Sequence, residues 1–284
     1  MMDSTKMLNK YADNLIGTRD KTHYMRYAEL FLKSADGMDK ASVEKFVNSL
    51  KRTGMAPGTI NFVFRIVRRL FIVNNIEWPF RRDDAPQIGQ RDEHKPALST
   101  EIIERMIAIR NELNPGERFL LALSTVYGLR REEMCNITPE DIGENTLFVK
   151  TLKHGRERYH LIPSALKSSI AYYDFSNTYS PGSASQAFWR IINTAGLEVL
   201  QAQRLGWHSI RRSLLMELHK AGADVFAVHS FMRWKGGGSE LAMDARYHAS
   251  RTIGVSGAVD VTNEAEADRE IFQYHPFLPM WEKD

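Results

Sequence analysis

The stretch HSIRRSLLMELHKAGADVFAVHSFMRW, residues 208–234, indicates most clearly how this chain folds. Its first part has the spacing of an amphipathic helix that ends near Gly222. His208 and Arg211 stand three positions apart, so their side chains are expected on one face of that helix. An imidazole and a guanidinium that converge on one spot can bind an anion such as a phosphate. The H-x-x-R spacing by itself is common, and the helix also has a buried face with Leu214, Leu215 and Leu218.

Two aromatic residues follow this helix. Trp234 ends the stretch, and Tyr247 comes after a run of three glycines, residues 236–238. The glycines predict a flexible loop, and a tyrosine just after such a loop can swing into or out of a site. Either aromatic residue alone also fits a plain core anchor.

A third motif is YGLRREE, residues 127–133. Gly128 is expected to end a helix over about 116–127, and Arg130 follows at the start of the next helix. Glu133 lies three residues beyond Arg130, within reach on the same helical turn, and can hold its guanidinium in place. A surface helix with ion pairs at this spacing gives the same pattern.

A fourth motif lies in a predicted hairpin. The β-rich runs NTLFVKTL, residues 145–152, and RERYHLIP, residues 156–163, are separated by Lys153, His154 and Gly155. A lysine on a tight β-turn can reach into a cleft and protonate a leaving oxygen if its neighbours lower its pKa. Lys153 on its own also fits an ordinary exposed turn lysine.

The chain as a whole is predicted to be mainly α with a small β-sheet, an α+β fold. Helical patterns fill a first domain, residues 1–84, and a polar segment with two prolines, residues 85–98, is interpreted as a linker. A second domain covers residues 99–252. The tail, residues 253–284, contains the apolar, aromatic sequence FQYHPFLPMW, which we interpret as a segment that docks onto a neighbouring protomer.

The basic residues of the first domain are candidates for DNA contacts. The net charge is only +3, so their distribution matters more than their number. In the helix predicted over residues 59–74 the arginines fall largely off the apolar stripe. Each cluster alone also fits a solvated helix face. The residues predicted to contact phosphates are Lys51, Arg52, Arg65, Arg68 and Arg69.

Several classes of protein do not fit the sequence. No apolar run approaches the roughly 20 residues of a membrane-spanning helix, and the first residues lack the apolar core of a signal peptide. The lone Cys135 has no disulfide partner in the chain, so a cytoplasmic location is expected. There is no G-x-x-x-x-G-K-[ST] loop and no carboxylate cluster of a two-metal site, so we expect neither cofactor nor catalytic metal.

Together these motifs resemble the tyrosine recombinase, or phage-type integrase, family. Arg, Lys, His-x-x-Arg, Trp and Tyr occur in that order between residues 130 and 247. GLRREEMCNI is similar to the first box of the family, and HSIRR resembles its H-x-x-R-H helix with arginine in place of the last histidine. KPALST resembles the usual start of its catalytic domain. The resemblance covers about 99–250 and reaches the first domain only by size and placement.

The resemblance implies a helical core-binding domain followed by a catalytic domain that cuts and rejoins DNA. Tyr247 would attack the phosphorus and form a 3′-phosphotyrosyl link, which conserves the bond energy and makes ATP unnecessary. Arg130 and Arg211 would bind the non-bridging oxygens, with Glu133 orienting Arg130. The two domains would close around double-stranded DNA, and four protomers would act on two DNA sites.

The remaining roles also follow from the resemblance. His208 would assist proton transfer at the nucleophile and hydrogen-bond the phosphate. Trp234, which stands where the family more commonly has histidine, would donate its indole N–H or pack to hold the site. Lys153 would protonate the leaving 5′ oxygen.

Alternatives remain open at this point. The distance from Trp234 to Tyr247 exceeds the usual family spacing because of the glycine run, which leaves Tyr274 as a second candidate nucleophile. A type IB topoisomerase would use the same chemistry without joining two sites. A DNA-binding regulator on a decayed recombinase fold, or a helical protein–protein module, would need no chemistry at all. The departures hint at a divergent branch of the family, archaeal or viral.

Overall fold

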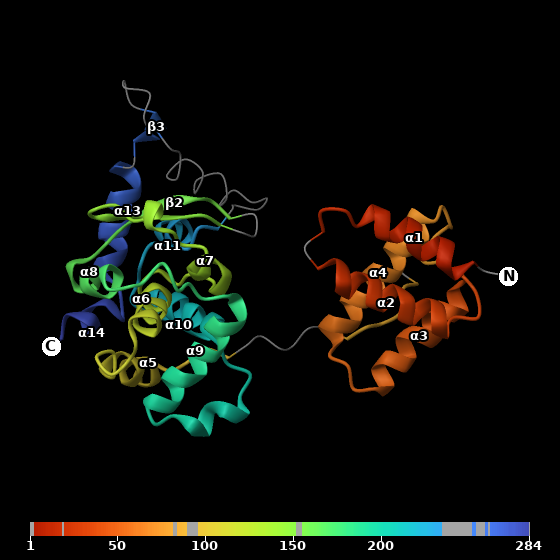
Figure 1. Ribbon diagram of the computed structural model, residues 1–284, viewed down its shortest axis with the longest axis horizontal. Coiled ribbons are helices and arrows are strands. Elements are labelled where there is room, and N and C mark those ends of the chain that lie inside the picture. The colour runs from red at the N-terminus through yellow and green to blue at the C-terminus, as the bar shows by residue number, and fades with distance from the viewer. Residues whose placement is uncertain are drawn as a thin grey trace. The chain divides into compact units, whose positions relative to one another are not determined.

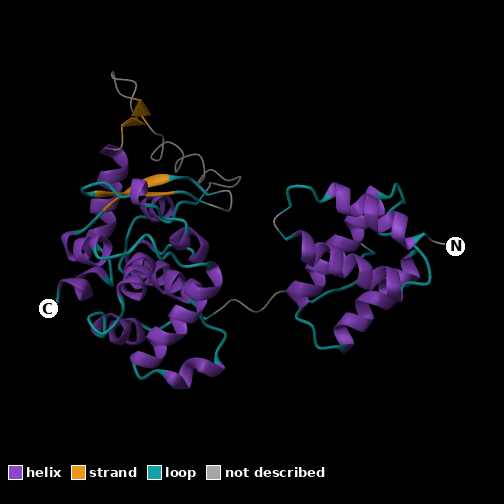
Figure 2. Ribbon diagram, viewed as in Figure 1, coloured by secondary structure: helices purple, strands orange, loops and turns teal. Residues whose placement is uncertain are grey.

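The structure, a computed structural model, divides into two compact units, Met1–His94 and Lys95–Asp284. Each unit has its own hydrophobic core. The division falls within the segment predicted as a linker. Helices dominate both units (Figure 2), and the predicted fold class, mainly α with a small β-sheet, is confirmed. The structure describes residues 3–18, 20–81, 84–89, 96–151, 155–234, 252–253, 259–260 and 262–283.

The first unit is a bundle of helices (Figure 1). Its helices are α1 (Ser4–Asn14), α2 (Lys21–Ser34), α3 (Lys40–Arg52) and α4 (Pro57–Val73).

Local sequence explains where these helices begin and which face they bury. The side chain of Asp39 caps α3 by accepting a hydrogen bond from the amide of Ser42 at 2.8 Å. On α4, Arg65 and Arg68 are exposed, so these two arginines lie away from the core. The apolar stripe predicted for this helix is buried and consists of Ile60, Val63, Val67, Leu70 and Phe71.

The second unit contains the remaining described elements (Figure 1). They are α5 (Thr100–Ala108), α6 (Pro115–Tyr127), α7 (Arg131–Cys135), η1 (Pro139–Asp141), β1 (Thr146–Val149), β2 (Arg158–Leu161), α8 (Ser164–Ala171), α9 (Pro181–Thr194), η2 (Glu198–Ala202), α10 (Trp207–Lys220), α11 (Val225–Phe231), β3 (Thr252–Ile253), β4 (Val259–Asp260), α13 (Thr262–Gln273) and α14 (Leu278–Glu282).

Helix α6 is the centre of the second unit. Residues 119–127 are all buried, and α7, α8, α9 and α10 pack against them. Asn114 caps the helix by accepting from the amide of Glu117 at 2.9 Å, and a proline occupies the first turn. Gly128 ends the helix in the left-handed conformation, with φ of 56°.

The predicted hairpin is present. β1 and β2 pair antiparallel, with Thr146 opposite Leu161 and Val149 opposite Arg158. Its position matters because the hairpin lies between η1 and α8 in the chain and contacts α13. Lys153, at the predicted turn, lies outside the described residues.

The described part of the tail packs within its own unit, and docking of the tail onto a neighbouring protomer stays a prediction. Ile271 and Phe277 are fully buried within the same unit. The indole N–H of Trp281 donates to Thr125 on α6 at 3.1 Å. The aromatic end of the chain therefore completes its own core, because α6 offers both apolar surface and hydrogen-bond acceptors.

Among the residues that the structure describes, every helix is too short or too polar to cross a lipid bilayer.

A buried histidine in the tail makes the stability of the second unit depend on pH. The Nδ1 atom of His275 accepts from the amide of Leu278 at 2.9 Å, so its proton is on Nε2, which donates to the carbonyl of Val126 at 2.8 Å. Burial lowers the pKa of His275 to about 4, from 6.5. Between these values the unfolded chain binds a proton that the folded chain does not. The stabilisation is therefore complete above pH 6.5 and is lost as the pH falls towards 4.

We predict that the stability of His275→Gln depends less on pH, because the variant lacks the proton that His275 takes up when the chain unfolds. The free energy of unfolding should fall by about 1.4 kcal/mol less per pH unit than in the wild type between pH 6.5 and 4. Urea unfolding at a series of pH values measures the slope. The exposed His219, on α10, gives the control variant His219→Gln. An unchanged slope in the His275 variant would contradict this account.

Candidate active site

Arg130 and Glu133 form a tight pair at the start of α7. The Glu133 carboxylate accepts from the Arg130 amide at 2.8 Å and from Nη1 of its guanidinium at 2.6 Å. The Arg130 side chain remains 24% exposed, whereas the Glu133 side chain is completely buried. This geometry fixes the guanidinium from behind and leaves part of it facing solvent. The pairing expected from the spacing is thus present.

Arg211 is held in the interior. It is 4% exposed, and its Nη1 and Nη2 atoms donate to the carbonyls of Gly128 at 2.5 Å and Met232 at 2.8 Å. Its guanidinium carbon lies 5.9 Å from the ring centre of Trp234. The structure therefore brings Arg211 and Trp234 together at the junction of α6, α10 and α11.

His208 differs from Arg211 in its exposure. It is exposed at the start of α10 and lines a pocket with Arg130, and Arg211 does not line this pocket. Arg211 instead points into the interior, where its guanidinium binds two backbone carbonyls. Joint binding of one anion by His208 and Arg211 stays a prediction.

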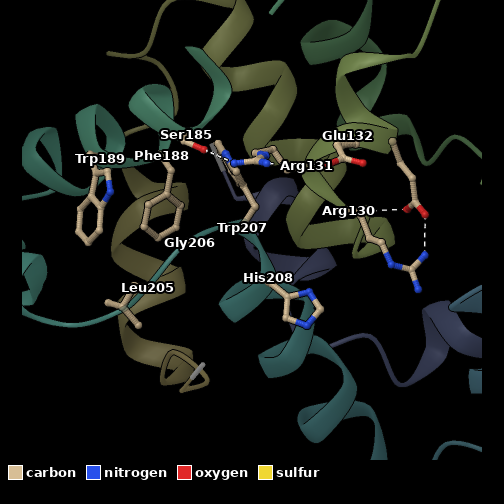
Figure 3. A pocket seen from close by; sticks show the side chains of 11 residues that line it. Arg130, Arg131, Glu132, Ser185, Phe188, Trp189, Leu205, Gly206, Trp207 and His208 are labelled. Atoms are coloured by element: carbon tan, nitrogen blue, oxygen red, sulfur yellow. Dashed lines mark hydrogen bonds and ion pairs between the residues drawn. The ribbon is translucent and has the colours of Figure 1, made fainter. Parts of the chain in front are cut away.

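The pocket lies between α7, α9 and the start of α10 and has a volume of about 450 Å³ (Figure 3). Arg131 reaches across it and donates to the hydroxyl of Ser185 at 2.7 Å. Two guanidiniums, an imidazole and a hydroxyl thus surround one space, which suits an anionic oxygen group. The lining residues are Arg130, Arg131, Glu132, Glu133, Ser185, Phe188, Trp189, Leu205, Gly206, Trp207 and His208.

The interior beside the pocket carries an excess of positive charge. Arg233 is completely buried, and its Nη2 lies 3.4 Å from the Glu133 carboxylate, so Glu133 serves both Arg130 and Arg233. Burial lowers the pKa of Arg211 to about 9, and the nearby charges of Arg233 and Arg130 add to this effect. Burial also lowers the pKa of Arg233, to about 10, so Arg211 and Arg233 both remain protonated at neutral pH. An added anion would stabilise this cluster.

Several buried polar residues were not anticipated. Arg233 is one of them. Three others form a second buried cluster, in which Arg158 contacts Asp268 at 2.5 Å and His160 lies 3.3 Å from the same carboxylate. The one signal available in the sequence was an arginine inside an apolar stretch, HSFMRW, where a fully exposed side chain is not expected. That signal gives no indication of the partners.

The structure describes only one of the two candidate nucleophiles. Tyr247 lies outside the described residues, as does Lys153. Tyr274 is described: it follows α13, is 39% exposed and does not line the pocket.

The basic residues predicted to contact DNA lie on α3 and α4 and differ in their contacts. Arg65 and Arg68 are exposed on α4, whereas Arg69 donates twice to Asn14, at 2.9 Å each. Lys51 and Arg52 form the last turn of α3. Lys51, Arg52, Arg65 and Arg68 are thus all exposed, whereas Arg69 is partly buried.

Known proteins similar to this chain share both its sequence pattern and its fold. Tyrosine recombinase XerA of Thermococcus kodakarensis is 21% identical over 228 residues, covering 74% of this chain and 78% of the relative. The structure of a lambda integrase dimer bound to a COC′ core site matches with a TM-score of 0.59 at 15% identity, covering 84% of this chain and 96% of that chain. The structure of XerH site-specific recombinase bound to difH substrate matches with a TM-score of 0.58 at 17% identity, covering 86% and 81%.

A match to a whole family is more decisive than any one relative. Residues 97–251 match the phage integrase family. Because this match spans more than half of the sequence, the chain belongs to the phage integrase family. The resemblance to tyrosine recombinases is therefore confirmed, and so is the predicted enzyme class, a tyrosine-type DNA strand transferase.

The glycine beside Arg211 provides a test of the site's packing. A Cβ at Gly128 would lie 3.2 Å from Leu214 and 3.4 Å from the Arg211 side chain, on a backbone with φ of +56°. A Cβ at Gly222 would meet nothing within 4 Å, at a φ of +82°. Gly222→Ala is therefore a control for the backbone conformation alone.

We predict that both alanine variants destabilise the protein, and Gly128→Ala more strongly. Gly222→Ala should cost about 1 kcal/mol because of its positive φ, and Gly128→Ala should cost about 1–3 kcal/mol more because its neighbours must move. Urea unfolding monitored by circular dichroism measures both. Equal losses would mean that the close packing at Gly128 has no energetic effect.

Proposed function

We propose that this protein is a site-specific DNA recombinase that cuts and rejoins double-stranded DNA through a covalent link to Tyr247, without ATP or a metal ion. The observation that carries the proposal is the group of three arginines, the partly exposed Arg130 and the buried Arg211 and Arg233, near the buried carboxylate of Glu133. A phosphodiester in the adjoining pocket would supply the missing negative charge. Membership of the phage integrase family supports the same reaction.

In this reaction the arginines stabilise the charge that develops on the phosphate. Arg130 presents the part of its guanidinium that Glu133 does not cover. Arg211 has five N–H donors, and its contacts to Gly128 and Met232 use two of them, so others remain for a phosphate oxygen. Donors fixed before the substrate arrives need no reorganisation in the transition state. Loss of either arginine should slow cleavage on the order of 10²–10³-fold.

The other groups carry out the nucleophilic attack and the proton transfers. The Tyr247 oxygen attacks phosphorus, the bond to the 5′ oxygen breaks, and the product is a 3′-phosphotyrosyl link. His208 assists removal of the tyrosine proton, Lys153 gives a proton to the leaving 5′ oxygen, and Trp234 supports the phosphate beside Arg211. Attack by a 5′ hydroxyl on the phosphotyrosyl link reverses these steps and rejoins the strand, with no external energy source.

The proposed partner is double-stranded DNA, in the cytoplasm. The similar structures named above are bound to DNA sites, which supports this partner. Exposed Arg65 and Arg68 on α4 would bind backbone phosphates. Recombination between two sites calls for four protomers, one for each strand that is cut.

The covalent step gives a direct test. DNA carrying this gene and its flanks is mixed with the protein in EDTA, and SDS-resistant adducts are resolved on a gel. We expect an adduct with the wild type and with Tyr274→Phe, and none with Tyr247→Phe. An adduct that persists in Tyr247→Phe would assign the nucleophile elsewhere. Tight DNA binding without any adduct would favour a regulator on the same fold, and relaxation of supercoils without joined products would favour a topoisomerase.

Salt dependence tests the role of α4. We predict that Arg65→Ala and Arg68→Ala each weaken binding to duplex DNA of random sequence and make the slope of log affinity against log salt shallower by about 0.9. Lys33→Ala, at an exposed cation on α2, is the control and should leave the slope unchanged. Slopes equal to the wild type in both arginine variants would exclude phosphate contacts at these positions.

A further inference from the structure

Arg233 occupies a position that is unfavourable for an arginine in two respects. Its φ is 58°, in the left-handed region that disfavours side chains with a Cβ. Its side chain is also completely buried, and burial lowers the pKa of its guanidinium to about 10. A glycine would avoid both costs, and an apolar residue would avoid the cost of burying a charge. The contacts of this arginine must therefore supply something that those residues cannot.

Those contacts join three parts of the second unit. Nη1 lies 2.8 Å from Nε2 of His160 on β2 and donates to the carbonyl of Phe231 at 3.1 Å. Nη2 lies 3.4 Å from the Glu133 carboxylate on α7. The planar guanidinium thus bridges β2 and α7, which a single ammonium could not do with the same geometry.

The charge of Arg233 matters most to Glu133. Burial acts to raise the pKa of this carboxyl, but the charge of Arg233 is the largest opposing effect, ahead of the Arg130 amide and guanidinium. The net result is a pKa below the ordinary value. Arg233 and Arg130 thus both favour the ionised form of the carboxylate that holds Arg130.

His160 and Asp268 hold Arg233 on its other side. Because a guanidinium can only donate, Nε2 of His160 must accept, and the imidazole proton is on Nδ1, which faces Asp268 at 3.3 Å. Burial lowers the pKa of His160 to about 4, so the ring is neutral at physiological pH. Asp268 is itself fixed by Arg158 at 2.5 Å and by the amide of Leu161 at 2.7 Å. The orientation of Arg233 is thus set by α13 and β2.

The backbone at Arg233 fixes two further parts of the site. Its carbonyl accepts from the amide of Arg156 at 3.1 Å, on the strand side of the loop that contains Lys153. Gly155 packs so closely that a Cβ there would lie 2.8 Å from this carbonyl. The preceding carbonyl, of Met232, accepts from Arg211. The left-handed turn therefore places these two carbonyls toward different parts of the site.

We propose that Arg233 is a positioning residue for strand cleavage: it holds Glu133, and through Glu133 the guanidinium of Arg130, in the orientation that binds the scissile phosphate. The inference rests on the proposed function, since Arg130 is the group that it positions. Arg233 would not touch the DNA. It acts as the buried partner that lets one carboxylate orient an arginine at the pocket.

The test compares Arg233→Gly, which suits the left-handed backbone but removes the guanidinium, with Arg233→Lys, which keeps the charge and loses the bridge. Circular dichroism and urea unfolding establish that each variant is folded. In the adduct assay we expect cleavage by Arg233→Gly to be about 10–100-fold slower, with DNA affinity changed much less. Arg233→Lys should be intermediate. Arg190→Ala, which removes a similar Arg–Glu pair with Glu117 outside the pocket, is the control and should cleave at the wild-type rate.

A double-mutant cycle separates positioning from a general loss of structure. If Arg233 acts through Glu133, adding Arg233→Gly to Glu133→Gln should slow cleavage by less than about threefold, because Glu133→Gln has already removed the carboxylate through which Arg233 acts. Full additivity of the two losses, or a folded Arg233→Gly that cleaves at the wild-type rate, would overturn the proposal.

A second measurement does not depend on cleavage. Carbon-13 NMR of the glutamate carboxyls should show the midpoint of Glu133 moving to higher pH in Arg233→Gly and staying low in Arg233→Lys. An unmoved midpoint would overturn the inference about Arg233. A wild-type protein that forms no adduct, with the Glu133 midpoint shifted as expected, would instead count against the proposed function and leave the arginine–carboxylate coupling established.

Discussion

The site depends on one buried carboxylate placed among three guanidiniums. Glu133 accepts hydrogen bonds from the amide and side chain of Arg130 and also contacts Arg233. A lone buried carboxylate would be protonated, and arginines buried without it would repel one another. Their combination is stable and still carries excess positive charge, since Arg211 binds only backbone carbonyls in the contacts described. That excess makes the pocket suitable for a phosphodiester before any substrate is present.

The scaffold serves this arrangement by bringing distant segments to one place. Helix α6 ends at Gly128, whose carbonyl receives Arg211 from α10, and α7 begins two residues later with Arg130 as its N-cap. The tail adds Asp268, whose carboxylate lies 3.3 Å from His160, and His160 in turn contacts Arg233. Docking of α13 is therefore connected to the active-site arginines through direct contacts. The C-terminal helices contribute to the site although they lie outside the segment that matches the family.

Sequence periodicity predicted the features that repeat along an element. The α4 stripe, the hairpin and helix α10 each follow from regular apolar spacing or β-rich composition, and the Arg130–Glu133 pair follows from its local i,i+3 spacing. The rest depends on contacts between elements far apart in the chain. A buried arginine such as Arg233 has no periodic signature, and its partners are identified only once β2 and α7 approach it. The apolar tail was recognised, but pattern alone cannot tell whether its partner is the same chain or another.

The central claim is that this charged pocket directs phosphoryl transfer to one tyrosine. The most direct measurement is mass spectrometry of the protein–DNA adduct after digestion with protease and nuclease. The account predicts a single modified peptide whose fragments carry a nucleotide 3′-phosphate on Tyr247. Modification of Tyr274 or of a residue other than tyrosine would contradict the account.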